Sequence, residues 1–372
     1  MRLFRAAGAA VLAATLLLVS ACMREKPRTP EEVRAELLHL LPREAQDRAG
    51  WAGDIQTALA ALEIAPTTEN LCATLAVIAQ ESSFVADPPV AGLDRIARTE
   101  IERRATARGI PLFVVRSALQ IQSSDGRTYD QRLASVRTEQ DLSHLYEEMI
   151  AKVPMGPRLL SGANPVRTGG PMQVSMAFAQ QHARARKYPY PVTGGIRQEV
   201  FSRRGGLYFG IAHLLGYPAS YERPLYRFAD FNAGMYASRN AAFQAAVGRA
   251  AGRDVPRDGD LLLQGGRRAG DQVGSTEDAV RSLATQLGMT HDQIHRALRQ
   301  GGSAKFERSA LYQKVFALAE QKAGKPLPRA LIPNINLASP KITRKLTTEW
   351  FATRVDKRHR TCMAKAAAVT PG

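Results

Sequence analysis

The chain has 372 residues, of which 45% are hydrophobic and 23% are charged; this composition is typical of a globular protein and excludes an intrinsically disordered one. The length corresponds to one large domain or two small ones. Lysine and arginine outnumber aspartate and glutamate by 51 to 34, and the resulting net charge of +17 predicts an anionic partner, such as a nucleic acid, an acidic lipid or an acidic polymer.

Residues 1–21 have the pattern of a secretory signal peptide. Two arginines precede an apolar run over residues 6–19 that is too short for a membrane span, and small residues follow it. Cys22 comes next, as in the bacterial lipobox, so we expect Cys22 to be lipidated and to attach the protein to a membrane. The alternative is an ordinary signal peptide followed by an incidental cysteine. Met23, in place of an acidic retention residue, favours an outer-membrane lipoprotein of the cell envelope that faces the periplasm.

Export narrows the anionic partners to cell-wall carboxylates and acidic lipid head groups. Residues 278–299 resemble a helix-turn-helix, but an exported chain does not meet DNA, and any tight helical hairpin has the same pattern. We therefore expect no nucleic acid as a partner. Cys72 and Cys362 are a natural disulfide pair in an oxidising compartment; the alternative is two buried, inert thiols.

Apolar residues at helical spacing predict helices over most of the chain that follows a polar tether at residues 22–30. The expected helices cover residues 31–41, 44–62, 67–84, several segments of 92–153, then 175–186, 198–215, 225–251, segments of 276–325 and 342–367. The best candidate for a strand is residues 260–263. The fold class is thus mainly α. We expect a helical domain at residues 31–252 with a helical insert at 85–168, and further helices in a C-terminal region at 253–372.

Three short blocks occur in a fixed order: AQESSF at residues 79–84, GGPMQV at 169–174 and DFNAG at 230–234. Together they resemble the signature blocks of the lysozyme-like lytic transglycosylases, which cut the glycan strands of peptidoglycan. The resemblance covers roughly residues 67–252 and implies a lysozyme-like helical domain with peptidoglycan glycan strands as its partner. It implies no cofactor and no metal ion. The first two blocks lie about ninety residues apart, several times the usual gap of the family.

Glu81 is the candidate catalytic residue. Cleavage of a glycosidic bond requires a carboxylic acid that is still protonated near neutral pH. The helical face of Glu81 is largely apolar, and its position near a helix C-terminus disfavours a charged carboxylate, so both effects raise its expected pKa. The resemblance implies that Glu81 protonates the bridging oxygen and then takes a proton from the C6 hydroxyl of N-acetylmuramic acid. The product is a 1,6-anhydro sugar.

The resemblance also implies a set of substrate-binding residues, namely Ser82, Gly170, Met172, Gln173, Phe231, Asn232 and Gly234. Two positions depart from the family pattern. Pro171 stands where Leu is common, and Phe231 stands where the family has a Tyr whose hydroxyl contacts the catalytic carboxyl. Tyr208, Tyr226 and Tyr236 are candidates to supply that hydroxyl instead.

Two alternative functions follow from these departures. A chain that has lost catalysis would be a non-catalytic peptidoglycan-binding or structural envelope lipoprotein. A lysozyme-type glycoside hydrolase would need a second carboxylate, for which Asp87, Glu199 and Asp230 are candidates. Arginines in the insert, between residues 95 and 108, either grip the carboxylates of stem peptides or lie on a solvated helical face.

Overall fold

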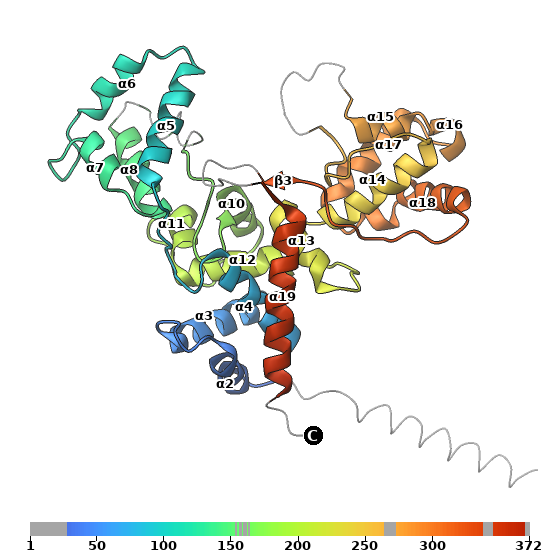
Figure 1. Cartoon of the computed structure of the whole chain (residues 1–372), viewed down its shortest axis with the longest axis horizontal. Helices are drawn as coiled ribbons and strands as arrows, with labels where there is room; N and C mark the ends of the chain where they lie inside the picture. Colours follow the sequence, from blue (N-terminus) through green and yellow to red (C-terminus); the bar gives the residue numbers. More distant parts are fainter. Residues whose placement is uncertain are drawn as a thin grey trace, which may run out of the picture.

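The computed structural model of the chain describes residues 28–152, 155, 158, 162, 164–263, 273–337 and 345–368. The expectation of a mainly helical fold is confirmed: helices are joined by loops, and the described strands form two short antiparallel hairpins (Figure 1). Within these residues, no helix combines the length and the apolar character needed to cross a membrane. Cys22, with its expected lipid and the signal peptide, lies outside the described residues.

A first hydrophobic core surrounds α12 (Arg203–Leu215), most of whose residues are buried. The helix α12 contacts α3, α4, α10, α11 and α13. Further helices that contribute to this core are α2 (Pro30–Leu40), α3 (Arg48–Ala61), α4 (Thr68–Glu81), α10 (Met176–Ala185), α11 (Ile196–Phe201), α13 (Pro224–Ala233) and α19 (Thr348–Ala367). α19 comes from the C-terminal end of the chain and packs along both α4 and α13 (Figure 1).

The segment between the first two sequence blocks is helical, as expected. It consists of α5 (Leu93–Thr106), α6 (Leu112–Leu119), α7 (Tyr129–Ser135) and α8 (Glu139–Ala151). These four helices contact mainly one another and form a separate group beyond α10 and α11 (Figure 1). The insert therefore adds to the first core without interrupting it.

A second core is built by α14 (Ala237–Ala251), α15 (Ser275–Arg281), α16 (Ala284–Leu287), α17 (His291–Leu298) and α18 (Ala310–Ala323), with the 3-10 helices η2 (Arg299–Gly302) and η3 (Phe306–Arg308). Its centre is a cluster of Phe243, Phe306, Tyr312 and Phe316. The expected domain boundary at residue 252 does not coincide with the division between the cores, because α14 belongs to the second core and α19 to the first.

The single helix expected over residues 225–251 is wrong. Gly234 (φ 113°) and Tyr236 (φ 67°) have positive φ angles, so the chain breaks there into α13 and α14. The buried Asp230 carboxylate stabilises the corner by accepting hydrogen bonds from the backbone N–H groups of Tyr236 (3.0 Å) and Ser238 (2.6 Å). This break directs α14 into the second core.

The two hairpins are short. β1 (Thr168–Gly169) pairs with β2 (Val174–Ser175) in the second sequence block, and β3 (Asn336–Leu337) pairs with β4 (Leu346–Thr347) directly before α19. The strand expected at residues 260–263 does not form. There the buried Gln244 amide takes the place of a strand partner, accepting from the Gly259 N–H at 2.8 Å and donating to the Asp260 carbonyl at 3.0 Å.

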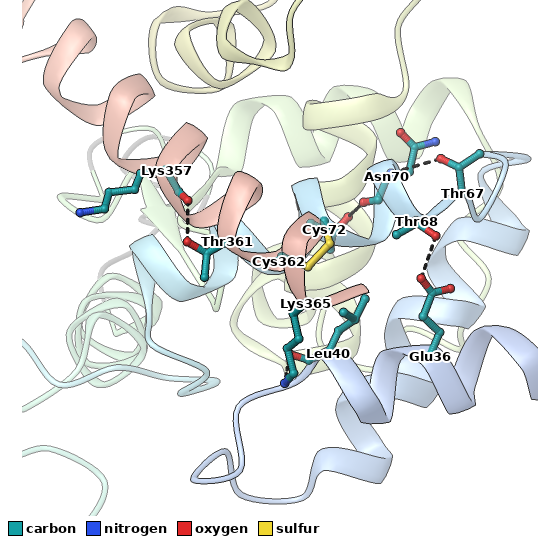
Figure 2. The surroundings of a disulfide bond; sticks show 11 residues. Glu36, Leu40, Thr67, Thr68, Asn70, Cys72, Lys357, Thr361, Cys362 and Lys365 are labelled. Atoms are coloured by element: carbon teal, nitrogen blue, oxygen red, sulfur yellow. Dashed lines mark hydrogen bonds between the residues drawn. A yellow bond between two sulfur atoms is a disulfide. The ribbon is translucent and has the colours of Figure 1, made fainter. Parts of the chain in front are cut away.

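Cys72 of α4 and Cys362 of α19 form a disulfide with a Cα–Cα distance of 5.5 Å (Figure 2). This is the pairing expected from the sequence. The bond joins residues 290 positions apart, and in the chain-entropy account closure of so long a loop stabilises the fold by about 5 kcal/mol. The disulfide fixes the C-terminal helix to the helix that carries Glu81.

Candidate functional site

Glu81 is the last residue of α4, so its expected position at a helix C-terminus is confirmed. The helix begins at the Thr67 cap, whose side chain accepts from the Asn70 N–H, and its middle is a continuous run of buried residues. It ends three residues before the predicted end at residue 84. Ser82 caps the helix: the Ser82 N–H (3.0 Å) and the Ser82 hydroxyl (3.2 Å) both donate to the Ile78 carbonyl.

The turn after Glu81 has an uncommon backbone conformation. Ser83 (φ 50°) and Phe84 (φ 62°) are consecutive non-glycine residues in the left-handed region, a conformation that is uncommon, costs free energy and is enriched at functional sites. Phe84 is buried and packs edge-to-face on Trp51, with ring centroids 5.6 Å apart. This contact fixes the turn that follows the candidate catalytic residue.

The second block forms the turn of the β1–β2 hairpin, which leads into α10. Gly170 has a φ of 73°, and a Cβ added there would overlap the Val200 carbonyl oxygen. Gln173 is a further non-glycine residue with a positive φ (49°). Its Oε1 accepts from the Thr168 hydroxyl at 3.2 Å, and its Nε2 donates to the Gly170 carbonyl at 3.4 Å. The turn is thus held by its own hydrogen bonds.

The third block ends α13. Phe231 is buried between His213 of α12, at a centroid distance of 5.2 Å, and Phe351 of α19, at 6.4 Å. Asn232 Oδ1 accepts a hydrogen bond from the Thr348 hydroxyl of α19 at 2.8 Å. Its amide nitrogen and the second lone pair of Oδ1 are the polar groups that this side chain can still offer to a ligand.

The second and third blocks pack on α12, and the first and third contact the first two turns of α19. His213 lies between Phe178 of α10 (4.8 Å) and Phe231 of α13, so it joins the helix that follows the second block to the third block. Arg354, one helical turn after Phe351, donates from Nε to Gln80 Oε1 at 3.4 Å. The end of α4 therefore reaches the part of α19 that also holds the third block.

Sequence reasoning missed the roles of His213 and α19 at this site. Burial lowers the pKa of His213 to about 4, so the ring is neutral at physiological pH. It packs between Phe178 and Phe231, and together with Phe351 these rings form an aromatic layer. A histidine within an apolar helix is the only sequence signal of this role. Thr348 and Phe351 lie in the helix expected at residues 342–367, but nothing in their spacing points to the third block.

Several of the predicted substrate-binding residues are buried, which disfavours direct contact of their side chains with a substrate. Met172 is fully buried against Gly210 of α12, Ser82 caps α4, and Phe231 fills the aromatic layer. Their side chains support the blocks and do not face a ligand. Gly170 is buried as well and serves the backbone of the hairpin turn. Gln173, Asn232 and Gly234 are partly exposed and remain candidates for contact with substrate.

Two of the three candidates for a second carboxylate, Asp230 and Glu199, are buried and accept hydrogen bonds from other residues of the fold. Asp230 is buried and accepts from the hydroxyls of Tyr217 (2.9 Å) and Tyr221 (2.6 Å) in addition to two backbone N–H groups. Glu199 is buried and bonded to the Tyr188 hydroxyl at 2.7 Å and to Arg204 at 3.0 Å.

Asp87 is half-buried in the loop after the first block. Burial raises its pKa, and the neighbouring carboxylates of Asp141 and Glu139 raise it further. Its carboxyl group thus belongs to an acidic cluster with the first turn of α8.

The tyrosines proposed to replace the missing hydroxyl have partners elsewhere. The Tyr208 hydroxyl lies 3.4 Å from His182 Nε2. The rings of Tyr226 and Tyr236 pack on Tyr221 and Tyr217, at the corner between α13 and α14.

Three cavities border these elements. A cavity of about 620 Å³ lies beside the left-handed turn and is lined by Trp51, Ser83 and Arg203 among others. An adjoining cavity of about 560 Å³ lies between α4 and α19. A third, of about 310 Å³, is lined by Gly234 and by loops of the second core. Glu81, Gln173 and Asn232 do not line these three cavities.

The arginines of the insert are largely paired within it. Arg98 forms an ion pair with Asp130 at 2.6 Å, and Arg103 and Arg104 both contact Glu100. The hydrogen bond from Arg103 is the main reason that the pKa of Glu100 falls to about 2. This pairing favours the solvated helical face over a grip on stem peptides.

Comparison with known proteins places the chain in a family. The profile of a family described as "Protein of unknown function (DUF1615)" matches residues 44–365. The uncharacterized protein YaiW of Escherichia coli strain K12 is 51% identical over 354 residues, which cover 94% of this chain and 96% of that protein. No solved structure matches. Because the family profile spans most of the chain, this protein belongs to the DUF1615 family, whose function is unknown.

Proposed function

We propose that this protein is a peptidoglycan lytic transglycosylase in which Glu81 is the acid and the base. The proposal is supported by three sequence blocks, more than 140 residues apart at their extremes, that share two helices: the second and third pack on α12, and the first and third contact α19. Within that arrangement Glu81 ends a helix and precedes two residues in the left-handed region. This combination is expected of a constrained active-site turn and is unusual in a connecting loop.

The chemistry needs one carboxylic acid and no water. Protonated Glu81 donates its proton to the bridging oxygen while the bond from C1 of N-acetylmuramic acid to that oxygen breaks. The carboxylate then accepts the proton of the C6 hydroxyl, whose oxygen forms the new bond to C1. Glu81 ends in its starting form, and the released N-acetylglucosamine carries the first proton. The negative end of the α4 dipole favours the protonated acid at the start of this cycle.

The partly exposed amides of the other two blocks would orient the sugar. Gln173 lies in the hairpin turn and Asn232 at the end of α13. Each amide can donate to and accept from a hydroxyl or an N-acetyl group. The expected envelope location, through a lipid on Cys22, would place the enzyme next to its substrate.

The test is release of muropeptides from purified sacculi by the chain that starts after Cys22, which retains every described residue. Wild type and Glu222→Gln should release soluble fragments, and Glu81→Gln should release none while sedimenting with sacculi as wild type does. Glu222 is an exposed loop residue, so its variant controls for loss of one negative charge. Full activity of Glu81→Gln would overturn the proposal.

A second candidate function is a non-catalytic peptidoglycan-binding lipoprotein. The observation that favours it is the substitution of Tyr by Phe231, together with the engagement of Tyr208, Tyr226 and Tyr236 elsewhere. This candidate predicts that wild type binds sacculi and releases nothing. A hydrolase is less well supported, because Asp230 and Glu199 are buried and accept hydrogen bonds from other residues of the fold.

A further inference from the structure

The cavity between α4 and α19 is amphipathic. Its floor consists of apolar side chains from α2, from α4 and from the segments that follow these two helices: Leu40, Pro42, Leu75, Ala76, Ala79 and Phe84. Its rim consists of the cations Arg354, Lys357, Arg358 and Lys365, which α19 presents on one face. No acidic residue lines it. Its volume of about 560 Å³ lies within the range of small-molecule sites.

No described carboxylate pairs with the rim cations. In the part of the chain that the structure describes, none of the four has a carboxylate within 4.0 Å. Arg354 and Arg358 donate from Nε to the same uncharged acceptor, Gln80 Oε1, at 3.4 Å and 3.3 Å. Burial lowers the pKa of Arg358, and the nearby charge of Arg354 lowers it further. A cluster of this kind is stabilised by an anion.

The groove is preformed. Cys362 lines it, and its disulfide to Cys72 joins the two helices that form the walls. Figure 2 shows Lys357, Thr361 and Lys365 following one another along α19, with Lys365 extended toward Leu40 at the end of α2. Because the walls are fixed covalently, a ligand does not have to order them on binding.

We propose that this groove binds one chain of an anionic lipid, with the acyl chain on the apolar floor and the head group at Arg354, Lys357 and Arg358. The apolar floor distinguishes such a ligand from free phosphate and from the carboxylates of cell-wall peptides, which have nothing to place there. The absence of lining acids distinguishes it from a zwitterionic lipid, whose cationic group would find no partner. The inference goes beyond the proposed function and does not involve Glu81.

The experiment is calorimetric titration of the chain that starts after Cys22 with 1-palmitoyl lysophosphatidylglycerol below its critical micelle concentration. The matched probes are lysophosphatidylcholine, with the same chain and a zwitterionic head group, and glycerol 3-phosphate, with an anionic head group and no chain. We expect saturable one-to-one binding of the anionic lipid, at least tenfold weaker binding of the zwitterionic lipid and no measurable binding of glycerol 3-phosphate.

Two sets of variants locate the site. Removal of two rim charges in Arg354→Gln/Lys357→Gln should weaken binding about 25-fold, at about fivefold for each charge near a lipid head group. Arg360→Gln/Lys325→Gln removes the same charge from exposed positions that do not line the groove and should bind as wild type does. Ala79→Leu, which fills the floor from a partly exposed position, should weaken binding at least tenfold with unchanged charge.

The proposal is overturned by an absence of binding, by equal binding of the two lipids, by equal binding of glycerol 3-phosphate, or by an unchanged affinity in the rim variant. The rim variant keeps the proposal testable if Ala79→Leu fails to fold. Glu81→Gln should bind the anionic lipid with wild-type affinity. If the transglycosylase proposal fails, the expected lipid affinity does not change, so the two proposals can be tested independently.

Discussion

The Thr348 hydroxyl donates to Asn232 Oδ1 at 2.8 Å, across 116 positions of the sequence. This bond attaches the first turn of α19 to the end of α13, where the third sequence block lies. Replacement by Thr348→Val keeps the shape and removes the donor, so the free energy of unfolding should fall by about 1 kcal/mol. Urea denaturation measures it, with the exposed Thr353→Val as control. Equal midpoints for wild type and Thr348→Val would contradict this role.

Reduction of the Cys72–Cys362 disulfide should lower stability by about 2–5 kcal/mol, because the bond closes a very long loop and holds α19 against α4. The measurement is the urea midpoint with and without a thiol reductant. The double variant Cys72→Ala/Cys362→Ala should start from the lower midpoint and should not respond to reductant. A wild-type midpoint that reductant leaves unchanged would show that the bond adds nothing to stability.

His213 makes stability depend on pH. Its folded pKa of about 4 lies below the unfolded value because of burial, so the unfolded chain takes up a proton first as the pH falls. The stability that His213 contributes is fully present above a pH of about 6.5 and is lost as the pH falls to about 4. Because the residue keeps some exposure, we expect the free energy of unfolding to fall by about 2 kcal/mol over this range.

The check is a comparison of unfolding free energies at several pH values for wild type and His213→Phe. The variant retains the aromatic layer with Phe178 and Phe231 and should show a flatter profile over this window. Parallel profiles would contradict the assignment to His213. They would point instead to His182 or His359, whose pKa values are also lowered.

Gly170 is required by the hairpin turn. Gly170→Ala forces a side chain onto a φ of 73° and against the Val200 carbonyl, so we expect a loss of at least 2 kcal/mol of stability. Gly53→Ala is the matched control, since a Cβ there meets no atom within 4 Å in the helix α3, and should be neutral or slightly stabilising. Thermal unfolding of both variants tests the contrast, and a tolerated Gly170→Ala would argue against a constrained turn.

The sequence predicts the parts of this fold that follow local rules. The Thr67 cap, the apolar stripe of α4 and the position of Glu81 at its end could all be read from residue types and spacing. The pairing of Cys72 with Cys362 follows from cysteine count and compartment. The helical insert follows from its periodicity.

The rest depends on tertiary contacts that have no local signature. Ser83 and Phe84 are not residues that signal a left-handed backbone; packing of Phe84 on Trp51 holds them there. The break between α13 and α14 depends on Asp230, whose four hydrogen-bond donors come from residues that only the fold brings together. Phe351 and Thr348 reach the third block from more than a hundred residues away.

The most direct test of the central claim is mass spectrometry of the muropeptides that wild type releases from sacculi in heavy-oxygen water. The account predicts products that end in 1,6-anhydro-N-acetylmuramic acid and carry no heavy oxygen, because the C6 hydroxyl of the sugar displaces the leaving group. Products with a reducing end that has taken up heavy oxygen would contradict it and would identify a hydrolase.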